Sequence, residues 1–433
     1  MKLRPFELAL VITFVVLFIA ALFILANYEP PPPPGEVSIK QPITIWGTVD
    51  PAGIEEVLKI AIDNDESFRL VTYWYINPDD FDWRLINALA DGVGPDLVLV
   101  SHEKLVSLRK RIAPISYESF PLPDVRATYL DGAEIFALND GMYAMPIAVD
   151  PLMMYWNRDI LSTEGYIQPP ATWEQLVNTQ FPDLIERDFD RTIRRSVVAM
   201  GEYNNVRNAF GAISMLLIQG GSVLVTEGRR GYQIDMEEQI GGSGNPMLTT
   251  ADFYTRFSRP SNSLYSWNRS LGEDRSEFIS EDLALYFGYG SEGHELERLN
   301  PNLNFSIAEV PQGGTATVRR TYGKFYGLSI LNSSDNFAEA QRVLYTLGGV
   351  DFANRISLAA DMVPLHRTNV ALGSNDIFTR TAYLTAPIAR GWLSPNLNDA
   401  NAAFSTMVSD INENRRTVDQ AVGDAAGRLK LAY

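Results

Sequence analysis

The chain contains no cysteine and only three histidines among its 433 residues. The lack of thiols excludes disulfide bonds, thiolate metal sites, a cysteine nucleophile and a lipid-bearing N-terminal cysteine. His102, His294 and His366 show no H-x-x-x-H spacing, so a zinc site would need carboxylates as its other ligands. We therefore expect neither a metal site nor a cofactor.

Basic residues are also scarce. The chain has 36 lysine and arginine residues and 53 aspartate and glutamate residues, which gives a net charge of −17. Nucleic-acid binding needs clustered basic side chains, so we expect no nucleic-acid partner. Adhesion of the folded part to anionic lipid is disfavoured for the same reason. With 46% hydrophobic and 21% charged residues, the composition is otherwise that of a globular protein.

One long apolar run stands near the start of the chain. Residues 8–26 (LALVITFVVLFIAALFILA) carry no charge, and five prolines follow at 30–34. A helix of that length spans about 28 Å at 1.5 Å per residue, close to the thickness of a bilayer's hydrocarbon core. Lys2 and Arg4 precede the run, which places the N-terminus in the cytoplasm by the positive-inside rule.

These features predict a single-pass protein of the cell membrane whose C-terminal domain lies outside the cytoplasm. Residues 1–7 would be cytoplasmic, 8–26 a transmembrane anchor and 27–37 a stiff proline-rich linker. A cleaved signal peptide is the alternative. The run is longer than the apolar part of most signal peptides, and its exit at 25–28 matches a cleavage site poorly.

Strand and helix patterns alternate after the linker. Strands are expected at 42–46, 68–75 and 95–100, with helices at 54–62, 83–90 and 103–109. Such alternation is typical of a doubly wound α/β domain, whose ligand crevice lies at the carboxyl ends of the strands. The loops at 47–50 and 101–102 would line that crevice.

The rest of the chain changes character. Residues 172–300 are predicted to be mostly helical, with β-strands at 304–310 and 323–330 and helix again at 400–431. The residues after the linker are too many for one hydrophobic core, so two domains are expected.

The order of several segments resembles a known family. The segments are GPDLVLVSHEKL (94–105), DGMYAMPIAVDPLMMYWNRDIL (140–161), PPATWEQL (169–176), FISEDLALYFGYGSE (278–292) and DMVPLHRT (361–368). Together they are similar to the extracellular solute-binding proteins of ABC importers, family 1, the sugar-binding group that includes maltodextrin-binding protein. The resemblance covers nearly all of residues 43–433.

The resemblance implies a periplasmic-binding-protein type II-like fold: two α/β lobes, a hinge and a ligand cleft. The chain would cross the hinge near 148–150, 305–311 and 364–367. Lobe one would hold residues 38–148 plus 310–364, and lobe two residues 150–304 plus 366–433. The lobes would close on a ligand that binds the closed form better than the open form.

The function implied by the resemblance is capture of a small solute, with a mono- or oligosaccharide favoured, and its delivery to an ABC permease. We expect a monomer that is not an enzyme. Peptide, polyol and nucleoside ligands stay open, because this fold does not determine the class of ligand.

Carbohydrate binding needs aromatic rings to stack on the apolar sugar face, together with polar groups for the hydroxyls. Trp46 ends the first strand, Trp267 lies in a polar segment, Tyr289 follows a strand, and Trp392 lies in the RGWLSP loop. Each is a candidate ligand contact. Each also has a packing alternative, which is favoured for Trp46 and is weakest for Trp392.

Polar candidates come from the predicted crevice loops and the hinge. They are Thr48 and Asp50 after the first strand, Ser101 and His102 after the third, and Asp150 at the first hinge crossing. Asp150 has an equally good alternative as a helix cap or hinge hydrogen bond. The polar stretch at 228–244 departs from the maltodextrin-type pattern, so the sugar is not identified.

Two other functions compete with transport. A sensor or adhesion module would keep the binding fold without a permease. A membrane-tethered glycoside hydrolase would use paired carboxylates. The chain shows no eightfold β/α repeat, no G-x-S-x-G elbow and no Walker-type loop, so catalysis is disfavoured.

Overall fold

The computed structural model describes Phe18, residues 38–228 and residues 231–433. Apart from Phe18, the predicted anchor and linker at 8–37 lie outside these residues. Within the described part, no helix is both long enough and apolar enough to cross a membrane. Residues Ile39–Tyr433 form one compact unit, and this unit is described below.

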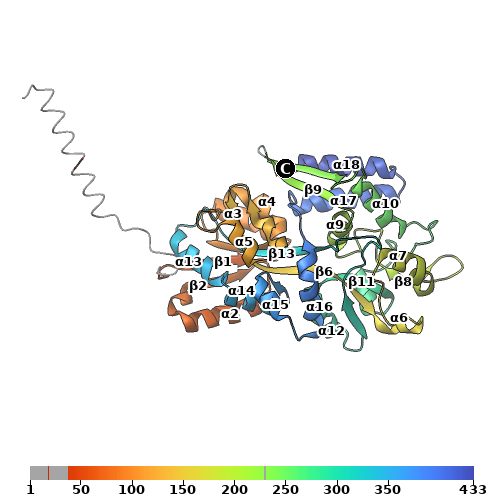
Figure 1. Ribbon diagram of the computed structural model, residues 1–433, viewed down its shortest axis with the longest axis horizontal. Helices are drawn as coiled ribbons and strands as arrows, with labels where there is room; N and C mark the ends of the chain where they lie inside the picture. Colours follow the sequence, from red (N-terminus) through yellow and green to blue (C-terminus); the bar gives the residue numbers. More distant parts are fainter. Residues whose placement is uncertain (1–17, 19–37, 229–230) are drawn as a thin grey trace, which may run out of the picture. The chain divides into compact units, whose positions relative to one another are not determined.

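One mixed sheet runs through the unit (Figure 1). Its strand order is β2-β1-β3-β13-β6-β11-β8-β7, and three short strands pair outside this path. The strands are β1 (Ile43–Gly47), β2 (Val71–Tyr75), β3 (Leu97–Ser101), β6 (Met145–Asn157), β7 (Glu186–Arg187), β8 (Ile193–Val198), β11 (Leu283–Tyr289), β12 (Phe305–Ala308), β13 (Thr321–Ile330), β14 (Val363–Pro364) and β15 (Ala389–Arg390).

The first three strands pair in parallel, as the predicted alternation requires. β1 lies between β2 and β3, with Ile45 opposite both Tyr73 and Leu97. β3 is buried along its whole length, which fits its nearly continuous run of apolar residues. The crossover helices are α2 (Pro51–Asn64) and α3 (Phe81–Ala90), so the predicted doubly wound half is confirmed.

The long strand β6 joins the two halves of the unit. All 13 of its residues are buried. Its first half pairs with β13 and β14, and its second half pairs with β11 and β12. A strand that is buried on both faces is expected to have a mostly apolar sequence. In β6 the only charged or amide side chains are those of Asp150 and Asn157.

The buried hydrophobic side chains form separate clusters. Lobe one is defined by the cluster that contains Val149, Phe325 and Ala389. Lobe two contains the other two clusters, one with Leu152, Tyr322 and Trp392 and one with Tyr155, Trp267 and Phe278. The chain therefore passes between lobes at 149–152, 322–325 and 389–392. The lobe boundaries expected from the sequence remain a proposal, and these clusters place the second and third crossings later along the chain than 305–311 and 364–367.

Helices cover both faces of the sheet (Figure 1). In lobe one they are α2, α3, α4 (Leu105–Leu108), α5 (Leu122–Thr128), α13 (Phe337–Leu347), α14 (Val350–Ala359) and α15 (Arg367–Leu372). In lobe two they are α6 (Arg158–Thr163), α7 (Trp173–Gln175), α8 (Phe181–Leu184), α9 (Ala209–Gln219), α10 (Pro246–Arg256), α11 (Asp274–Ile279), α12 (Gly293–Leu299), α17 (Leu397–Asn412) and α18 (Val418–Leu431). α16 (Ile377–Thr385) contacts elements of both lobes.

The expectation of mostly helical structure at 172–300 was wrong in part. This range contains the sheet strands β7, β8 and β11, and β9 (Ser222–Gly228) and β10 (Gly231–Gln239) form an antiparallel hairpin. Outside the range, β4 (Ala137–Leu138) pairs with β5 (Gly141–Met142) in a second small sheet. Ile234 and Met236, two positions apart on β10, are buried. This alternation with period two favours a strand over a helix.

The β9–β10 hairpin also contacts lobe one. Arg109 pairs with Glu227 at 2.6 Å and donates a hydrogen bond to the Tyr232 hydroxyl at 3.1 Å. The Arg109 guanidinium lies over the rings of Tyr143 and Tyr232, about 5.4 and 5.5 Å from their centroids. This contact ties the hairpin of lobe two to the surface of lobe one.

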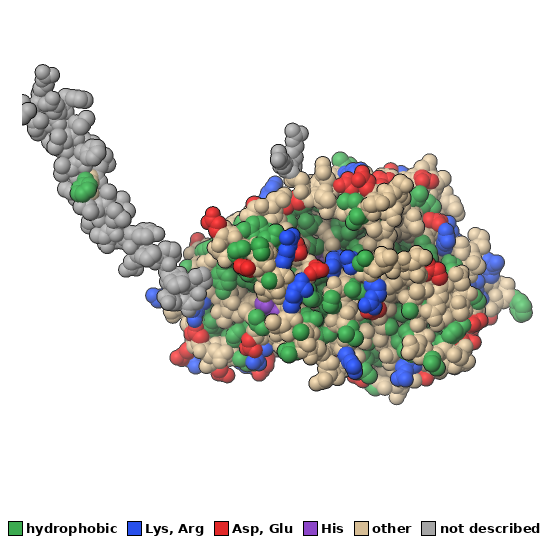
Figure 2. Space-filling model, in the orientation of Figure 1, with side chains coloured by type: hydrophobic (Ala, Val, Ile, Leu, Met, Phe, Trp, Pro, Cys, Tyr) green, Lys and Arg blue, Asp and Glu red, His purple; other side chains and the backbone are tan. Residues whose placement is uncertain are grey.

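Acidic and basic side chains are interspersed on the face shown in Figure 2.

Candidate functional site

Two charged residues face each other where the central strands cross between the lobes. Asp150 of β6 and Lys324 of β13 are register partners in the sheet. Asp150 is 4% exposed, and it accepts hydrogen bonds from the Ser291 amide at 3.1 Å and the Ser291 hydroxyl at 2.6 Å. The Lys324 ammonium lies 4.1 Å from the centroid of the Tyr289 ring. The crossing strands β6 and β13 and the end of β11 thus bring a carboxyl group, a cation and an aromatic ring close together.

A second carboxylate joins this group from lobe one. Glu103, which follows β3, is buried and accepts hydrogen bonds from the Tyr322 hydroxyl at 2.6 Å and the Ser101 hydroxyl at 3.1 Å. Tyr322 belongs to the hydrophobic cluster of lobe two, so this hydrogen bond joins the lobes. We call Glu103, Asp150, Tyr289, Tyr322 and Lys324 the crossover cluster.

The crossover cluster keeps one carboxylate ionised and holds a proton on the other near neutral pH. Burial raises the pKa of Asp150 to about 7, although Ser291 and Lys324 act in the opposite direction. Burial also acts to raise the pKa of Glu103, but Lys324, His102 and the two hydroxyl donors outweigh it and hold that pKa below its usual value. The cluster can therefore offer both a charged and a neutral carboxyl group.

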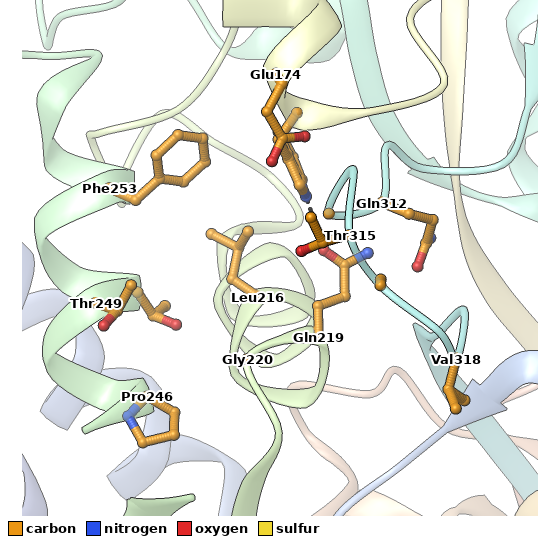
Figure 3. A pocket seen from close by; sticks show the side chains of 14 residues that line it. Glu174, Leu216, Gln219, Gly220, Pro246, Thr249, Phe253, Gln312, Thr315 and Val318 are labelled. Atoms are coloured by element: carbon orange, nitrogen blue, oxygen red, sulfur yellow. Dashed lines mark hydrogen bonds between the residues drawn. The ribbon is translucent and has the colours of Figure 1, made fainter. Parts of the chain in front are cut away.

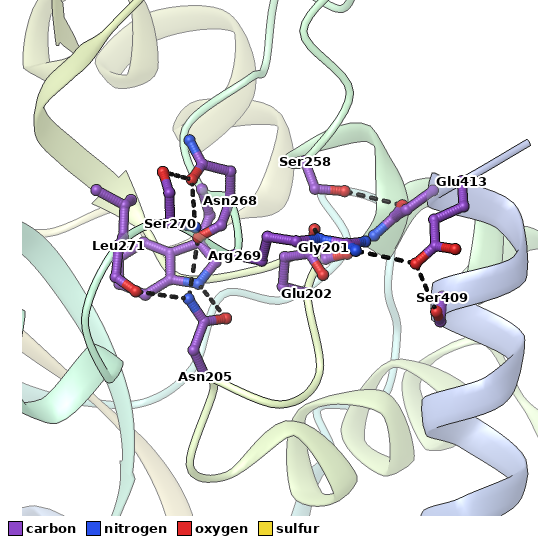
Figure 4. A network of polar contacts seen from close by, with 12 residues as sticks. Gly201, Glu202, Asn205, Ser258, Asn268, Arg269, Ser270, Leu271, Ser409 and Glu413 are labelled. Atoms are coloured by element: carbon purple, nitrogen blue, oxygen red, sulfur yellow. Dashed lines mark hydrogen bonds and ion pairs between the residues drawn. The ribbon is translucent and has the colours of Figure 1, made fainter.

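A pocket of about 220 Å³ lies in lobe two. Glu202, Tyr203 and Asn205 line it from the loop after β8, and Arg269 and Glu413 add an ion pair at 2.9 Å (Figure 4). Burial raises the pKa of Glu202. Burial, and to a lesser extent the Glu103 carboxylate, raises the pKa of Tyr203. All the residues that line this pocket belong to lobe two. Its aromatic ring, carboxylates and amides are the groups that bind sugars.

A larger pocket of about 410 Å³ lies elsewhere in lobe two. Phe253, Leu216 and Pro246 form one side of it, while Gln312, Thr315 and Val318 face them (Figure 3). Gln219 accepts a hydrogen bond from the Trp173 indole at 2.8 Å and donates to the Pro311 and Arg320 carbonyls. Like the smaller pocket, this one has no wall from lobe one.

Several of the residues predicted from the sequence do lie together. Asp150 and Tyr289 belong to the crossover cluster, and Ser101 donates a hydrogen bond to Glu103. His102 is fully buried next to them and accepts a hydrogen bond from the Phe325 amide at 3.1 Å. Burial lowers its pKa to about 4. A ligand-binding role for these four residues remains a prediction.

The residues predicted around the first strand lie at the end of β1. Trp46 is half-buried and packs against the cluster of lobe one. Thr48 is partly exposed. Asp50 is exposed and caps α2 by accepting a hydrogen bond from the Ala52 amide at 3.0 Å. Tyr73 holds this turn through hydrogen bonds with the Val49 backbone.

Trp267 and Trp392 are placed differently from the sequence expectation. Trp267 is fully buried, and its indole donates to the Asn205 amide oxygen at 3.1 Å. Trp392 is 3% exposed, packs against Phe210 and Phe404, and donates to the Ser214 hydroxyl at 2.9 Å. Both side chains fill hydrophobic cores, which favours the packing alternative for each. A ligand-binding role for them remains a prediction.

The sequence reasoning missed Glu103, Lys324, Glu202 and Tyr203. Lys324 had a usable signal, because it is the one charge in the otherwise uncharged stretch TYGKFYGLSI. Glu103 directly follows Ser101 and His102, which the sequence predicted as ligand contacts. Glu202 and Tyr203 lie in a loop whose sequence has no periodic pattern, so only the fold reveals them. Within residues 38–228 and 231–433, no group of histidine and carboxylate side chains is arranged to hold a metal ion.

The chain was compared with family models, with curated proteins and with solved structures. No family model matches the chain. A protein of Brucella abortus strain 2308 that is named as a binding protein is 20% identical over 334 residues, which cover 71% of this chain and 74% of that protein. A similarly named protein of Brucella suis biovar 1 gives the same values.

Solved structures with similar folds include sugar-binding proteins. A cyclo/maltodextrin-binding protein in complex with maltotetraose has a TM-score of 0.71 and 15% identity over 91% of this chain and 98% of its own. The sugar-binding protein MalE of Xanthomonas citri has a TM-score of 0.70 and 16% identity over 90% of this chain and 97% of its own. A solute-binding protein of Thermotoga lettingae, bound to tagatose, has a TM-score of 0.68 and 18% identity over 91% of this chain and 100% of its own. The predicted two-lobe α/β fold of the periplasmic-binding-protein type is confirmed.

Replacing Asp150 by Asn should change how stability depends on pH. The raised pKa means that the folded protein retains the Asp150 proton above the pH at which the unfolded chain releases it. The contribution of this proton to the free energy of unfolding is complete below about pH 4 and is lost as the pH rises through about 7. The free energy of unfolding falls by at most about 1.4 kcal/mol per pH unit in this range. Urea unfolding from pH 5 to 8 should therefore show a weaker decline in Asp150→Asn than in the wild type. An unchanged decline, or the same change in the exposed control Asp63→Asn, would contradict this assignment.

Replacing Trp392 by Ala should destabilise the protein by about 3–5 kcal/mol, because a large ring is removed from a closely packed core. The control Trp74→Ala removes a ring that is 58% exposed and should change stability by less than about 0.5 kcal/mol. Denaturant unfolding checks both. A Trp392→Ala protein of normal stability that no longer binds ligand would return this residue to the binding site.

Proposed function

We propose that the protein is a membrane-anchored, extracellular solute-binding protein. It captures a mono- or oligosaccharide between its two lobes by hinge closure and delivers it to an ABC permease. It acts as a monomer and does not turn its ligand over. The observation that carries this proposal is the crossover cluster, whose hydrogen bond between Tyr322 and Glu103 joins the two lobes.

The chemistry of this region suits a carbohydrate. The Tyr203 and Tyr289 rings supply apolar faces, and Glu103 and Glu202 supply acceptors for hydroxyl groups. A ligand favours the closed form over the open form only when it contacts groups of both lobes at the same time. The sugars bound by the structural neighbours support the same class of ligand.

The ligand proposal is tested with the full-length protein, in thermal-shift and calorimetric titrations with maltotetraose, tagatose, amino acids and short peptides. A ligand at a hundredfold excess over its dissociation constant adds about 2.7 kcal/mol of stability. We expect a sugar to produce this shift. Glu103→Gln and Glu202→Gln should each weaken binding by about 1.5–3 kcal/mol, since each removes a charged acceptor.

The exposed control Glu55→Gln should bind as the wild type does. Stabilisation by amino acids or peptides alone would refute the carbohydrate class. Release of a cleaved product would refute the role as a binding protein. If only one of the two carboxylate variants weakened binding, the ligand would not bridge the lobes.

The anchor proposal rests on the sequence of residues 8–26 and the proline-rich linker. We expect the full chain to sediment with cell membranes and to resist extraction by salt and high pH. The fragment 38–433 contains the whole compact unit beyond residue 38 and should fold without detergent. A full chain that remains in the supernatant would contradict the anchor.

A further inference from the structure

The imidazole of His294 lies between two carboxylates. Its Nδ1 atom is 3.1 Å from an Asp361 oxygen, and its Nε2 atom is 3.1 Å from an Asp376 oxygen. All three side chains are partly exposed, at 39%, 43% and 36% respectively. The group lies outside the crossover cluster and outside the pockets described above.

The three residues come from three elements that span both lobes. His294 is on α12, which packs in lobe two through the buried Leu296. Asp361 is in the turn between α14 and β14, next to Met362 of the lobe-one cluster. Asp376 caps the N-terminus of α16 by accepting hydrogen bonds from two amides.

Helix α16 bridges the lobes. Phe378, near its start, stacks on Phe305 of lobe two with ring centroids 5.3 Å apart and an angle of 7°. The same Phe378 ring meets His294 edge-on at 5.2 Å. Ala382 and Tyr383, further along, pack in the cluster of lobe one. His294 therefore connects lobe two directly to lobe one through Asp361, and to the bridging helix through Asp376.

The two contacts require a particular protonation state. An ionised carboxylate only accepts hydrogen bonds, and a neutral imidazole has a single N–H group. Both ring nitrogens can donate to their carboxylates only when the imidazole is a cation. Loss of its proton leaves one nitrogen lone pair facing a carboxylate, and that contact becomes repulsive.

We propose that His294, Asp361 and Asp376 form a pH-sensitive tie between the lobes, complete when the imidazole is charged and broken on one side when it is neutral. The tie fixes the relative position of the lobes seen in this structure. Its release makes hinge motion easier. An effect on ligand affinity rests on the proposed function, but the tie itself does not.

The electrostatic balance around the imidazole supports the charged form. Partial burial acts to lower the pKa of His294, but Asp361 and Asp376 outweigh it, and the pKa is raised above 6.5. The pKa of Asp376 is held below its usual value, because its amide hydrogen bonds and His294 outweigh burial. The tie is therefore complete when the imidazole is charged, below about pH 6.5, and is lost as the pH rises through the raised pKa of His294.

Other charged groups near α12 are engaged elsewhere. Glu295 pairs with Arg275 at 2.8 Å, and Glu292 accepts hydrogen bonds from Tyr286 and Asn208. On α14, Arg355 pairs with Asp351, and on α16, Arg380 is exposed.

The protonation state is tested by imidazole ¹⁵N NMR of the full-length protein. The other two histidines should not interfere, because burial lowers the pKa of His102 to about 4 and also lowers that of His366. We expect one imidazole with both nitrogens protonated at pH 6 and a midpoint above 6.5. Its assignment is checked by its loss in His294→Gln. A neutral His294 at pH 6 would overturn the proposal.

The tie is tested by the distance between two spin labels, which the cysteine-free chain allows to be placed uniquely. Val93→Cys after α3 in lobe one and Leu431→Cys on α18 in lobe two provide positions that are 69% and 89% exposed. We expect a narrow distance distribution at pH 6 and a broader one at pH 8.5. In His294→Gln the broad distribution should appear at both pH values.

Two further variants separate the tie from local folding. Asp376→Asn keeps a good helix cap, and Asp361→Asn suits the positive φ of +53° at that position. Both remove a carboxylate and should broaden the distribution at pH 6, while the surface control Asp351→Asn should match the wild type. A pH response that persists in His294→Gln would overturn the tie and leave the proposed ligand function untouched.

Discussion

The pairing of β6 with β13 is the constraint on which the rest of the structure depends. Both strands pass from one hydrophobic core to the other, and their backbone hydrogen bonds continue across the junction. Since buried backbone groups must be paired, the junction cannot come apart without a large cost. Movement of the lobes must bend or twist these strands. The side chains at the crossing, Asp150 and Lys324, are therefore the ones that any such movement displaces least.

The interior of the junction is unusually polar for a position so deeply buried. Glu103, Asp150 and His102 each have less than a tenth of their surface exposed. A charge in such a place is tolerated only when hydrogen bonds and an opposite charge compensate for lost hydration. Tyr322, Ser101, Ser291 and Lys324 supply that compensation. The junction is therefore held together by a compensated polar network in addition to apolar packing.

The sequence was a good guide to local structure and to fold class. The strands expected at 42–46, 95–100 and 323–330 match β1, β3 and β13 to within two residues, because apolar runs between turn residues depend on local chemistry. It was a poor guide to which aromatic rings lie in cores. Trp267 and Trp392 sit among polar or glycine neighbours along the chain, but packing is decided by residues distant in sequence, such as Phe404 and Asn205. Tyr203 approaches Glu103 only through the fold.

A sheet shared by both lobes also limits how the protein can be rearranged. The chain crosses the junction three times, and each lobe is completed by segments that return after a long excursion. Neither lobe is a contiguous stretch that could be excised, transplanted or duplicated by a single recombination event. Changes in ligand preference must therefore accumulate by substitution at the junction and in the surrounding loops, while the two halves evolve as one inherited unit.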